Sequence, residues 1–162
     1  MSDGARIAVD LHLPSLDGST VAPSRFPVLL DITPYGKDLS HYREGPGPLP
    51  YKYWPSRGFV RAQMDVRGTG ASDGNLDDNY FSPREVRDSY EAIEWLGTQA
   101  WSNGRVAAYG DSYRGISAYF AATQRPPHLK AIAADVSLAD LYRDISYHGG
   151  MLSQFFGGQF LA

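Results

Sequence analysis

Residues 105–123 read RVAAYGDSYRGISAYFAAT, and this stretch decides the fold. It starts with a short apolar run typical of a buried strand and ends with the few charges typical of a buried helix. Between the two lies GDSYRG, residues 110–115, in which a serine stands between glycines. A serine at a sharp strand-to-helix turn is the pattern of a nucleophile elbow, which exposes the serine hydroxyl. We therefore expect Ser112 to be a nucleophile and the backbone N–H of Tyr113 to face an oxyanion.

The same serine has a second interpretation. Serine is a preferred N-cap residue, so Ser112 could serve only to begin a helix in a non-catalytic binding or structural module. A serine hydroxyl becomes a good nucleophile only when a base removes its proton and hydrogen-bond donors hold the oxyanion. A catalytic interpretation therefore requires a base and a further donor elsewhere in the sequence.

The residues outside this stretch indicate an α/β fold. Residues 6–13 alternate apolar and polar side chains, which predicts a half-buried strand at a sheet edge. The continuous apolar run at 26–32 is typical of a strand covered on both faces of a parallel sheet, and further strands are expected at 58–66 and 130–136. Strands that alternate with helices in this way predict a mostly parallel sheet flanked by helices.

One helix start is clearly marked. The segment SPRE at 82–85 combines an N-cap serine, a proline at the first helical position and a glutamate at the third. This is a capping box, and the apolar spacing behind it predicts a helix that ends near Gly97. The stretch at 37–50 is rich in glycine, proline and charge and is predicted to be a surface loop.

The composition restricts the function classes. The chain has 162 residues, of which 43% are hydrophobic and 20% charged, as in one soluble domain. A net charge of -3 without a basic run argues against nucleic acid or anionic membranes as partners and favours a small-molecule substrate.

The sequence has no cysteine, which excludes a thiolate nucleophile. No apolar stretch reaches the roughly 18 residues of a membrane span, and without a secretory signal we expect a cytoplasmic protein.

Two other patterns resemble ligand sites but lack the necessary context. Gly68 and Gly70 follow a predicted strand, yet the next helix begins only near residue 82, so a dinucleotide site is not expected. We expect Asp65 and Arg67 to pair at this corner. No metal is expected at the acidic residues of the following loop, which lack the glycine and distal glutamate of a calcium hand: Asp73, Asp77 and Asp78.

Five segments, in order along nearly the whole chain, carry a family resemblance. They are TPYGK at 33–37, DVRGTGASDG at 65–74, WSNGRV at 101–106, GDSYRG at 110–115 and PPHLKAI at 126–132. Together they resemble the Xaa-Pro dipeptidyl-peptidase-like (S15) hydrolases, an α/β-hydrolase group that includes cocaine esterase and the α-amino acid ester hydrolases. The pattern is most similar to the cocaine-esterase-like branch.

The resemblance implies an α/β-hydrolase fold and a serine hydrolase that cleaves ester or amide bonds, acyl or Xaa-Pro dipeptidyl, through an acyl-enzyme intermediate. It implies that Ser112 is the nucleophile and that Tyr35, in the Pro-Tyr motif, donates its hydroxyl to the oxyanion. Tyr35 follows the carboxyl end of a predicted central strand, at the edge of an open α/β sheet where ligands bind. The expected substrate is a small ester, amide or short peptide. No cofactor is expected, and the oligomeric state stays open.

The residues after Ser112 offer two histidines and three aspartates as triad partners. His128 lies beyond a predicted helix of about 11 residues, roughly 16 Å long, and is expected at the opposite edge of the sheet. His148 follows the last predicted strand on the correct side, but the resemblance assigns residues 147–150 to the entry of a helical cap. A self-contained esterase that uses His148 as its base is a third hypothesis. The aspartates are Asp135, on the last predicted strand, and Asp140 and Asp144, in the cap entry.

The resemblance also implies a division of the chain. Residues 1–137 correspond to the N-terminal part of the catalytic domain and residues 138–162 to the start of the cap. The family's first strand, later strands, triad acid, catalytic histidine and C-terminal jelly-roll domain have no counterpart here. We therefore expect a fragment with little activity alone, whose unpaired sheet edge lowers its solubility.

Overall fold

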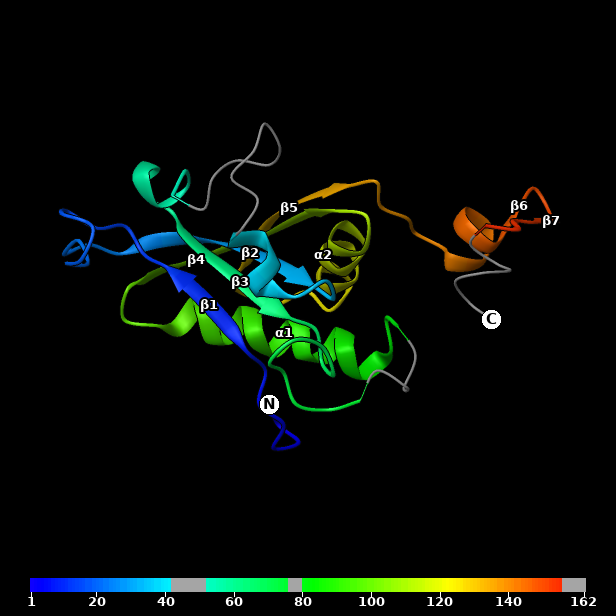
Figure 1. Cartoon of the computed structure of the whole chain (residues 1–162), viewed down its shortest axis with the longest axis horizontal. Helices are drawn as coiled ribbons and strands as arrows, with labels where there is room; N and C mark the ends of the chain where they lie inside the picture. Colours follow the sequence, from blue (N-terminus) through cyan, green and yellow to red (C-terminus); the bar gives the residue numbers. More distant parts are fainter. Residues whose placement is uncertain (42–51, 76–79, 156–162) are drawn as a thin grey trace.

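The structure is a computed structural model that describes residues 1–41, 52–75 and 80–155. Its centre is a five-stranded sheet built from β1 (Val9–His12), β2 (Phe26–Thr33), β3 (Val60–Asp65), β4 (Ser102–Asp111) and β5 (Leu129–Asp135). The strands lie in the order β1-β3-β2-β4-β5 (Figure 1). β1 is antiparallel to β3, whereas β3, β2, β4 and β5 are parallel. The predicted α/β fold is confirmed, with the alternating strand at one edge.

Two helices, α1 (Pro83–Thr98) and α2 (Tyr113–Thr123), pack on one face of the sheet. Side chains alternate between the faces of a strand, so every second residue of β2 and β3 points toward these helices. α1 contributes Ile93 and Leu96 to the resulting core, and α2 contributes Tyr113 and Ala121. The sheet contributes six buried residues from the two central strands: Val28, Leu30, Ile32, Val60, Ala62 and Met64.

α1 begins at the predicted residue, with the Ser82 half of the capping box formed and the Glu85 carboxylate bound to the residue before the N-cap. The N–H of Glu85 donates to the hydroxyl of Ser82 at 3.2 Å. The Glu85 carboxylate accepts the N–H of Phe81 at 2.8 Å. The helix ends at Thr98, one residue past Gly97, so the predicted position of its end is confirmed to within one residue, but Gly97 lies inside the helix and does not cap it. Gly97 is instead a packing site, where a Cβ atom would overlap the ring of His128.

The segment predicted as a surface loop at 37–50 is only partly comparable with the structure. It begins with a short 3-10 helix, η1 (Lys37–His41), so the prediction is wrong for these residues. Residues 42–50 lie outside the described part of the chain. A second 3-10 helix, η2 (Pro55–Arg57), precedes β3.

The predicted pair of Asp65 and Arg67 does not form. The Arg67 guanidinium binds Asp88 of α1 at 2.6 and 2.8 Å. The buried Asp65 carboxylate accepts backbone N–H groups from Lys37 at 2.6 Å and Ala71 at 2.9 Å. The reason is that a buried carboxylate needs donors, and the backbone of the segments that follow β2 and β3 supplies them.

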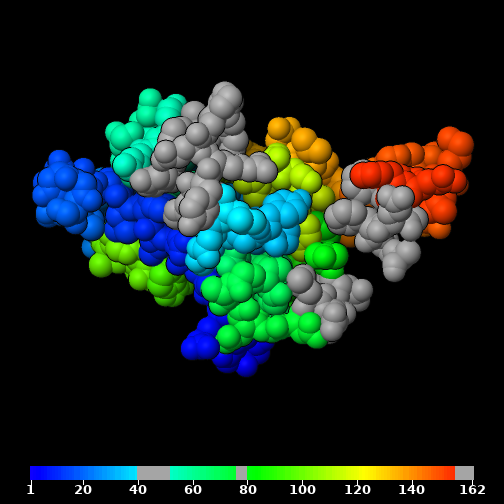
Figure 2. Space-filling view, in the orientation of Figure 1, coloured from blue at the N-terminus to red at the C-terminus, as the bar shows by residue number. Residues whose placement is uncertain are grey.

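The last described segment protrudes from the rest of the molecule. It contains the π-helical turn η4 (Tyr142–Ser146) and a two-stranded hairpin, β6 (Tyr147–His148) and β7 (Met151–Leu152). Figure 2 shows this segment, in orange and red, standing off beyond the residues that follow β5. The predicted cap entry at 138–162 falls here, and residues 156–162 are outside the described part. In the part that is described, no helix is long and apolar enough to cross a membrane.

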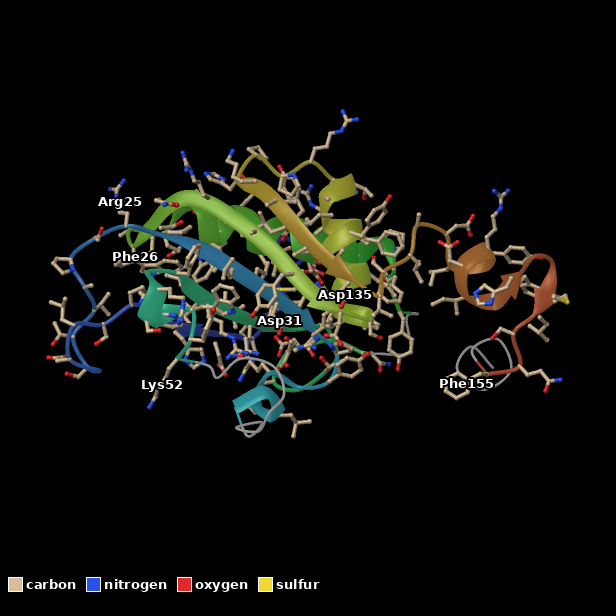
Figure 3. All side chains as sticks on the ribbon, turned by 90° about the horizontal axis from the view of Figure 1, so that it is seen from above. Arg25, Phe26, Asp31, Lys52, Asp135 and Phe155 are labelled. Atoms are coloured by element: carbon tan, nitrogen blue, oxygen red, sulfur yellow. The ribbon has the colours of Figure 1, made fainter. Side chains whose placement is uncertain are left out.

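The carboxyl ends of the parallel strands define one edge of the sheet. Figure 3 shows Asp31, near the end of β2, and Asp135, the last residue of β5, at this edge, away from Arg25 and Phe26. The loops that follow β2, β4 and β5 therefore start close together. Tyr35 lies on the first of these loops and Ser112 on the second, so the fold brings the two sequence motifs to one place.

Candidate active site

Ser112 occupies a strained turn between β4 and α2. Its backbone angles are φ 54° and ψ -128°, in a region that residues other than glycine seldom adopt. Its side chain is exposed and makes no hydrogen bond to the backbone of the helix that it precedes. A serine that only caps a helix would use its oxygen to accept an N–H of the first turn. The capping interpretation therefore lacks its defining hydrogen bond.

Two glycines make this turn sterically possible. A Cβ atom at Gly110 would overlap the side chain of Arg114, and one at Gly115 would overlap the backbone oxygens of Asp135 and Gly110. The N–H of Ser112 donates to that same Asp135 oxygen at 3.1 Å. α2 thus lies against the end of β5 at a distance that leaves no room for a side chain at position 115.

Tyr113 is anchored directly behind the turn. Its side chain is 7% exposed, and its hydroxyl donates to the Glu85 carboxylate, with oxygen distances of 2.8 and 3.0 Å. Burial raises the pKa of the Tyr113 hydroxyl, and the neighbouring Glu85 charge raises it further. As the first residue of α2, Tyr113 also presents a backbone N–H that has no acceptor within the helix. An oxyanion near Ser112 can accept that N–H.

Tyr35 lies beside Tyr113, at the carboxyl edge of the sheet. Its N–H donates to the Thr33 hydroxyl at 3.1 Å, which shapes the turn after β2. Its ring meets the ring of Tyr113 edge-on, with 6.4 Å between the centroids. The Tyr35 side chain is 52% exposed, so its hydroxyl can meet a ligand from solvent.

A charged cluster lies beneath the turn. Arg114, in the first turn of α2, binds Asp31 of β2 at 3.3 Å and also contacts Asp111. Burial raises the pKa of the Asp31 carboxyl, while the charges of Arg114 and Arg61 oppose that shift. This cluster joins the start of α2 to the centre of the sheet, and it contributes to a rigid support for Ser112.

The histidines with described side chains lie away from Ser112. His128 directly precedes β5, so the length of that strand, roughly 20 Å for seven residues, separates it from the carboxyl edge. The prediction for its position is confirmed, and its ring pairs with Glu94 of α1 at 2.9 Å. His12 of β1 is in register with Arg61, near the start of β3. His148 belongs to the protruding hairpin and contacts the backbone oxygen of Asp144.

The candidate triad aspartates bind nearby backbone N–H groups. Asp135 accepts the N–H of Val136 at 2.9 Å. Asp140 accepts two N–H groups of η4, and Asp144 accepts those of Ala139 and Asp140 at 2.9 and 3.0 Å. These hydrogen bonds hold the pKa of Asp144 below its usual value. The His128 ring binds the Glu94 carboxylate and the His148 ring contacts a backbone oxygen, so neither ring is bound to the side-chain carboxylate of Asp135, Asp140 or Asp144.

The acidic loop after β3 is described only in part. Asp73 is paired with Arg6 at 3.2 Å, whereas Asp77 and Asp78 lie outside the described residues. Within 1–41, 52–75 and 80–155, no three histidine, cysteine, aspartate or glutamate side chains could hold a metal ion together.

The contact between Glu85 and Tyr113 was not predicted from the sequence. Glu85 was identified only as the capping glutamate of α1, and 28 residues separate it from Tyr113. No local pattern links residues so far apart. The sequence marked Tyr113 as part of the elbow and Glu85 as part of a capping box. Only the packing of α1 against α2 brings the two side chains together.

Comparisons with known proteins identify the family of this chain. The family model described as X-Pro dipeptidyl-peptidase (S15 family) matches residues 3–162. A protein of Mycobacterium bovis named "Putative serine esterase" is 37% identical over 169 residues, which cover 96% of this chain and 26% of that protein. The cocaine esterase of a Rhodococcus species is 35% identical over 156 residues, covering 94% of this chain and 25% of the esterase.

A solved structure shows the same architecture. The crystal structure of a CocE/NonD family hydrolase from Staphylococcus aureus superposes with a TM-score of 0.76 and 31% identity, covering 92% of this chain and 28% of that one. The chain therefore spans about a quarter of the length of the relatives that it matches.

Proposed function

The chain belongs to the X-Pro dipeptidyl-peptidase (S15) family of hydrolases, and from this we propose that it carries the nucleophile and oxyanion hole of a serine hydrolase. The observation that carries the proposal is the backbone of Ser112, which is strained at φ 54° while its exposed side chain caps nothing. Such strain persists only where surrounding structure enforces it, and it is typical of functional sites.

The proposed reaction passes through an acyl-enzyme. The Ser112 oxygen attacks the carbonyl carbon of an ester or amide, and its proton passes to a base. The negative oxygen of the tetrahedral intermediate accepts hydrogen bonds from the Tyr113 N–H and the Tyr35 hydroxyl. The leaving alcohol or amine departs with a proton, and water then releases the acid and restores the serine. Since no described histidine lies at Ser112, we propose that the base comes from outside the described residues.

The proposed substrates are small esters, amides or short peptides. The names of the relatives, a serine esterase and a cocaine esterase, support ester cleavage, and the family name supports cleavage after a dipeptide. Tyr35 and Tyr80 are exposed aromatic side chains whose rings both contact Tyr113, so an apolar or aromatic substrate group would find partners beside the serine.

Acylation by an activated ester tests this proposal. The full chain is mixed with p-nitrophenyl acetate, and nitrophenolate release is followed together with the intact protein mass. We expect a burst that approaches one equivalent and a mass increase of one acetyl group, because the oxyanion donors assist attack and nitrophenolate leaves without taking up a proton, whereas hydrolysis of the acetyl-serine ester has a poorer leaving group and depends more on the base. Heat-unfolded chain is the control. A native chain that gains no acetyl group, or gains it no faster than the unfolded chain, would support the non-catalytic module instead.

Replacing Tyr35 with phenylalanine is expected to slow acylation by about 10²-fold, because loss of one oxyanion donor typically costs 10² to 10³ in rate. The ring contact with Tyr113 is kept, so the melting temperature is expected to stay unchanged. Tyr119→Phe, which removes an exposed hydroxyl from α2, is the matched control. Equal acylation rates for Tyr35→Phe and the native chain would exclude Tyr35 as a donor.

A further inference from the structure

We infer that Glu85 is a positioning residue for the oxyanion hole, acting through Tyr113. This inference rests on the proposed function, because it concerns the N–H that Tyr113 would offer to the oxyanion. Glu85 lies at the third position of α1 and Tyr113 at the first position of α2. One carboxylate therefore joins the starts of both helices.

The Glu85 carboxylate is buried and has several donors. It is 6% exposed, and both of its oxygens lie within hydrogen-bond distance of the Tyr113 hydroxyl, at 2.8 and 3.0 Å. One oxygen also accepts the N–H of Phe81 at 2.8 Å. Burial raises the pKa of the Glu85 carboxyl, against the opposing effect of the Tyr113 and Phe81 hydrogen bonds. A buried carboxyl is costly to place, so its donors hold it in one position.

The ring of Tyr113 is held along its whole length. It stacks on the ring of Phe81, with centroids 4.0 Å apart and planes at 26°. The rings of Tyr80 and Tyr35 meet it edge-on at 5.7 and 6.4 Å. The hydroxyl at the far end is fixed by Glu85. A tyrosine side chain has only two rotatable bonds, so a ring fixed at its tip and faces also fixes the Cα atom from which it extends.

That Cα atom carries the N–H of the proposed oxyanion hole. An oxyanion donor must be aimed before the reaction, since a displacement of about 1 Å can cost about 10²-fold in rate. The start of α1 does not require the contact with Tyr113, because the Glu85 N–H already donates to the Ser82 hydroxyl and the Glu85 carboxylate already accepts the Phe81 N–H. The bond to Tyr113 instead aligns the elbow.

The experiment compares acylation of the full chain by p-nitrophenyl acetate across four variants. Tyr113→Phe and Glu85→Leu are expected to lower the maximal acylation rate about tenfold, while the half-saturating ester concentration changes less than about twofold. Glu85→Gln is expected to stay within about threefold of the native rate, because an amide can still bind both the Phe81 N–H and the Tyr113 hydroxyl. The double variant Glu85→Leu/Tyr113→Phe is expected to be no slower than either single variant.

Tyr119→Phe is the control, and thermal melting reports folding in every case. Tyr113→Phe keeps the buried ring, so its acylation rate is sufficient to test the inference if Glu85→Leu does not fold. Folded Tyr113→Phe that acylates at the native rate would overturn the positioning role, as would a double variant whose losses multiply. Native chain that forms no Ser112 adduct would overturn the proposed function and this inference with it.

Discussion

Alanine at position 112 is expected to lower acylation by p-nitrophenyl acetate by about 10³-fold or more, to the rate of the unfolded chain. The reason is that the acyl group has no other activated oxygen to join, and loss of a nucleophile removes the covalent path entirely. The melting temperature is expected to stay unchanged, because the Ser112 side chain caps no N–H of α2. Intact-protein mass and a thermal melt on the same samples measure both quantities.

Ser117→Ala is the matched control for this prediction. Ser117 lies in the same helix, and its buried hydroxyl has no hydrogen-bond partner within the part of the chain that the structure describes. Its loss is therefore expected to leave acylation unchanged. If Ser112 were only a helix cap, the alanine variant would lose about 1 kcal/mol, or about 2 to 4 °C for a chain of this size, and acylation would persist.

Gly115→Ala is expected to destabilise the fold by about 1 to 3 kcal/mol, the usual cost of overpacking. Helix propensity alone predicts the opposite sign, because alanine is favoured over glycine by about 1 kcal/mol in a helix. Sterics decide the result, since the new Cβ would overlap the backbone oxygens of Asp135 and Gly110, and backbone cannot swing aside as a side chain can. Denaturant unfolding of the variant and of Ser117→Ala measures the difference.

The same substitution is expected to slow acylation at Ser112. Relief of the overlap requires α2 to move away from β5, and that movement breaks the hydrogen bond from the Ser112 N–H to the Asp135 oxygen. The elbow then loses its fixed geometry, at a cost of about 10²-fold in rate for a shift near 1 Å. A Gly115→Ala chain that is more stable than the native chain would contradict the conclusion that α2 lies too close to β5 for a side chain at position 115.

The elements with strong local signals were predicted well from the sequence. α2 has the predicted length of 11 residues and ends at residue 123 as expected, because a strand, an elbow and a low-charge helix follow one another without interruption. α1 starts where Ser82 and Glu85 predict it. The role of Gly97 as a helix terminator was wrong, because this position is a close contact with the ring of His128, which is distant in sequence. The partner of Arg67 was wrong for the same reason, since Asp88 becomes its neighbour only after α1 packs on the sheet.

The sequence predicted the residues of the candidate site but not the contacts that hold them in place. Ser112, Tyr113 and Tyr35 were identified from motifs, and the parallel sheet places their loops at one edge. The supporting contacts join residues that are far apart in sequence, since Glu85 and Tyr113 are separated by 28 residues and Asp31 and Arg114 by 83. Their contacts depend on how helices pack on the sheet, and no spacing in the sequence encodes that.

The most direct measurement is to find which residue of the folded chain reacts with a fluorophosphonate. The folded chain is treated with the probe, digested, and the modified residue is assigned by tandem mass spectrometry, with heat-unfolded chain in parallel. The proposal predicts one adduct per chain, on Ser112, which forms only in the folded protein. A folded chain that carries no adduct, or carries adducts spread over several exposed serines at the rate of the unfolded chain, would contradict it.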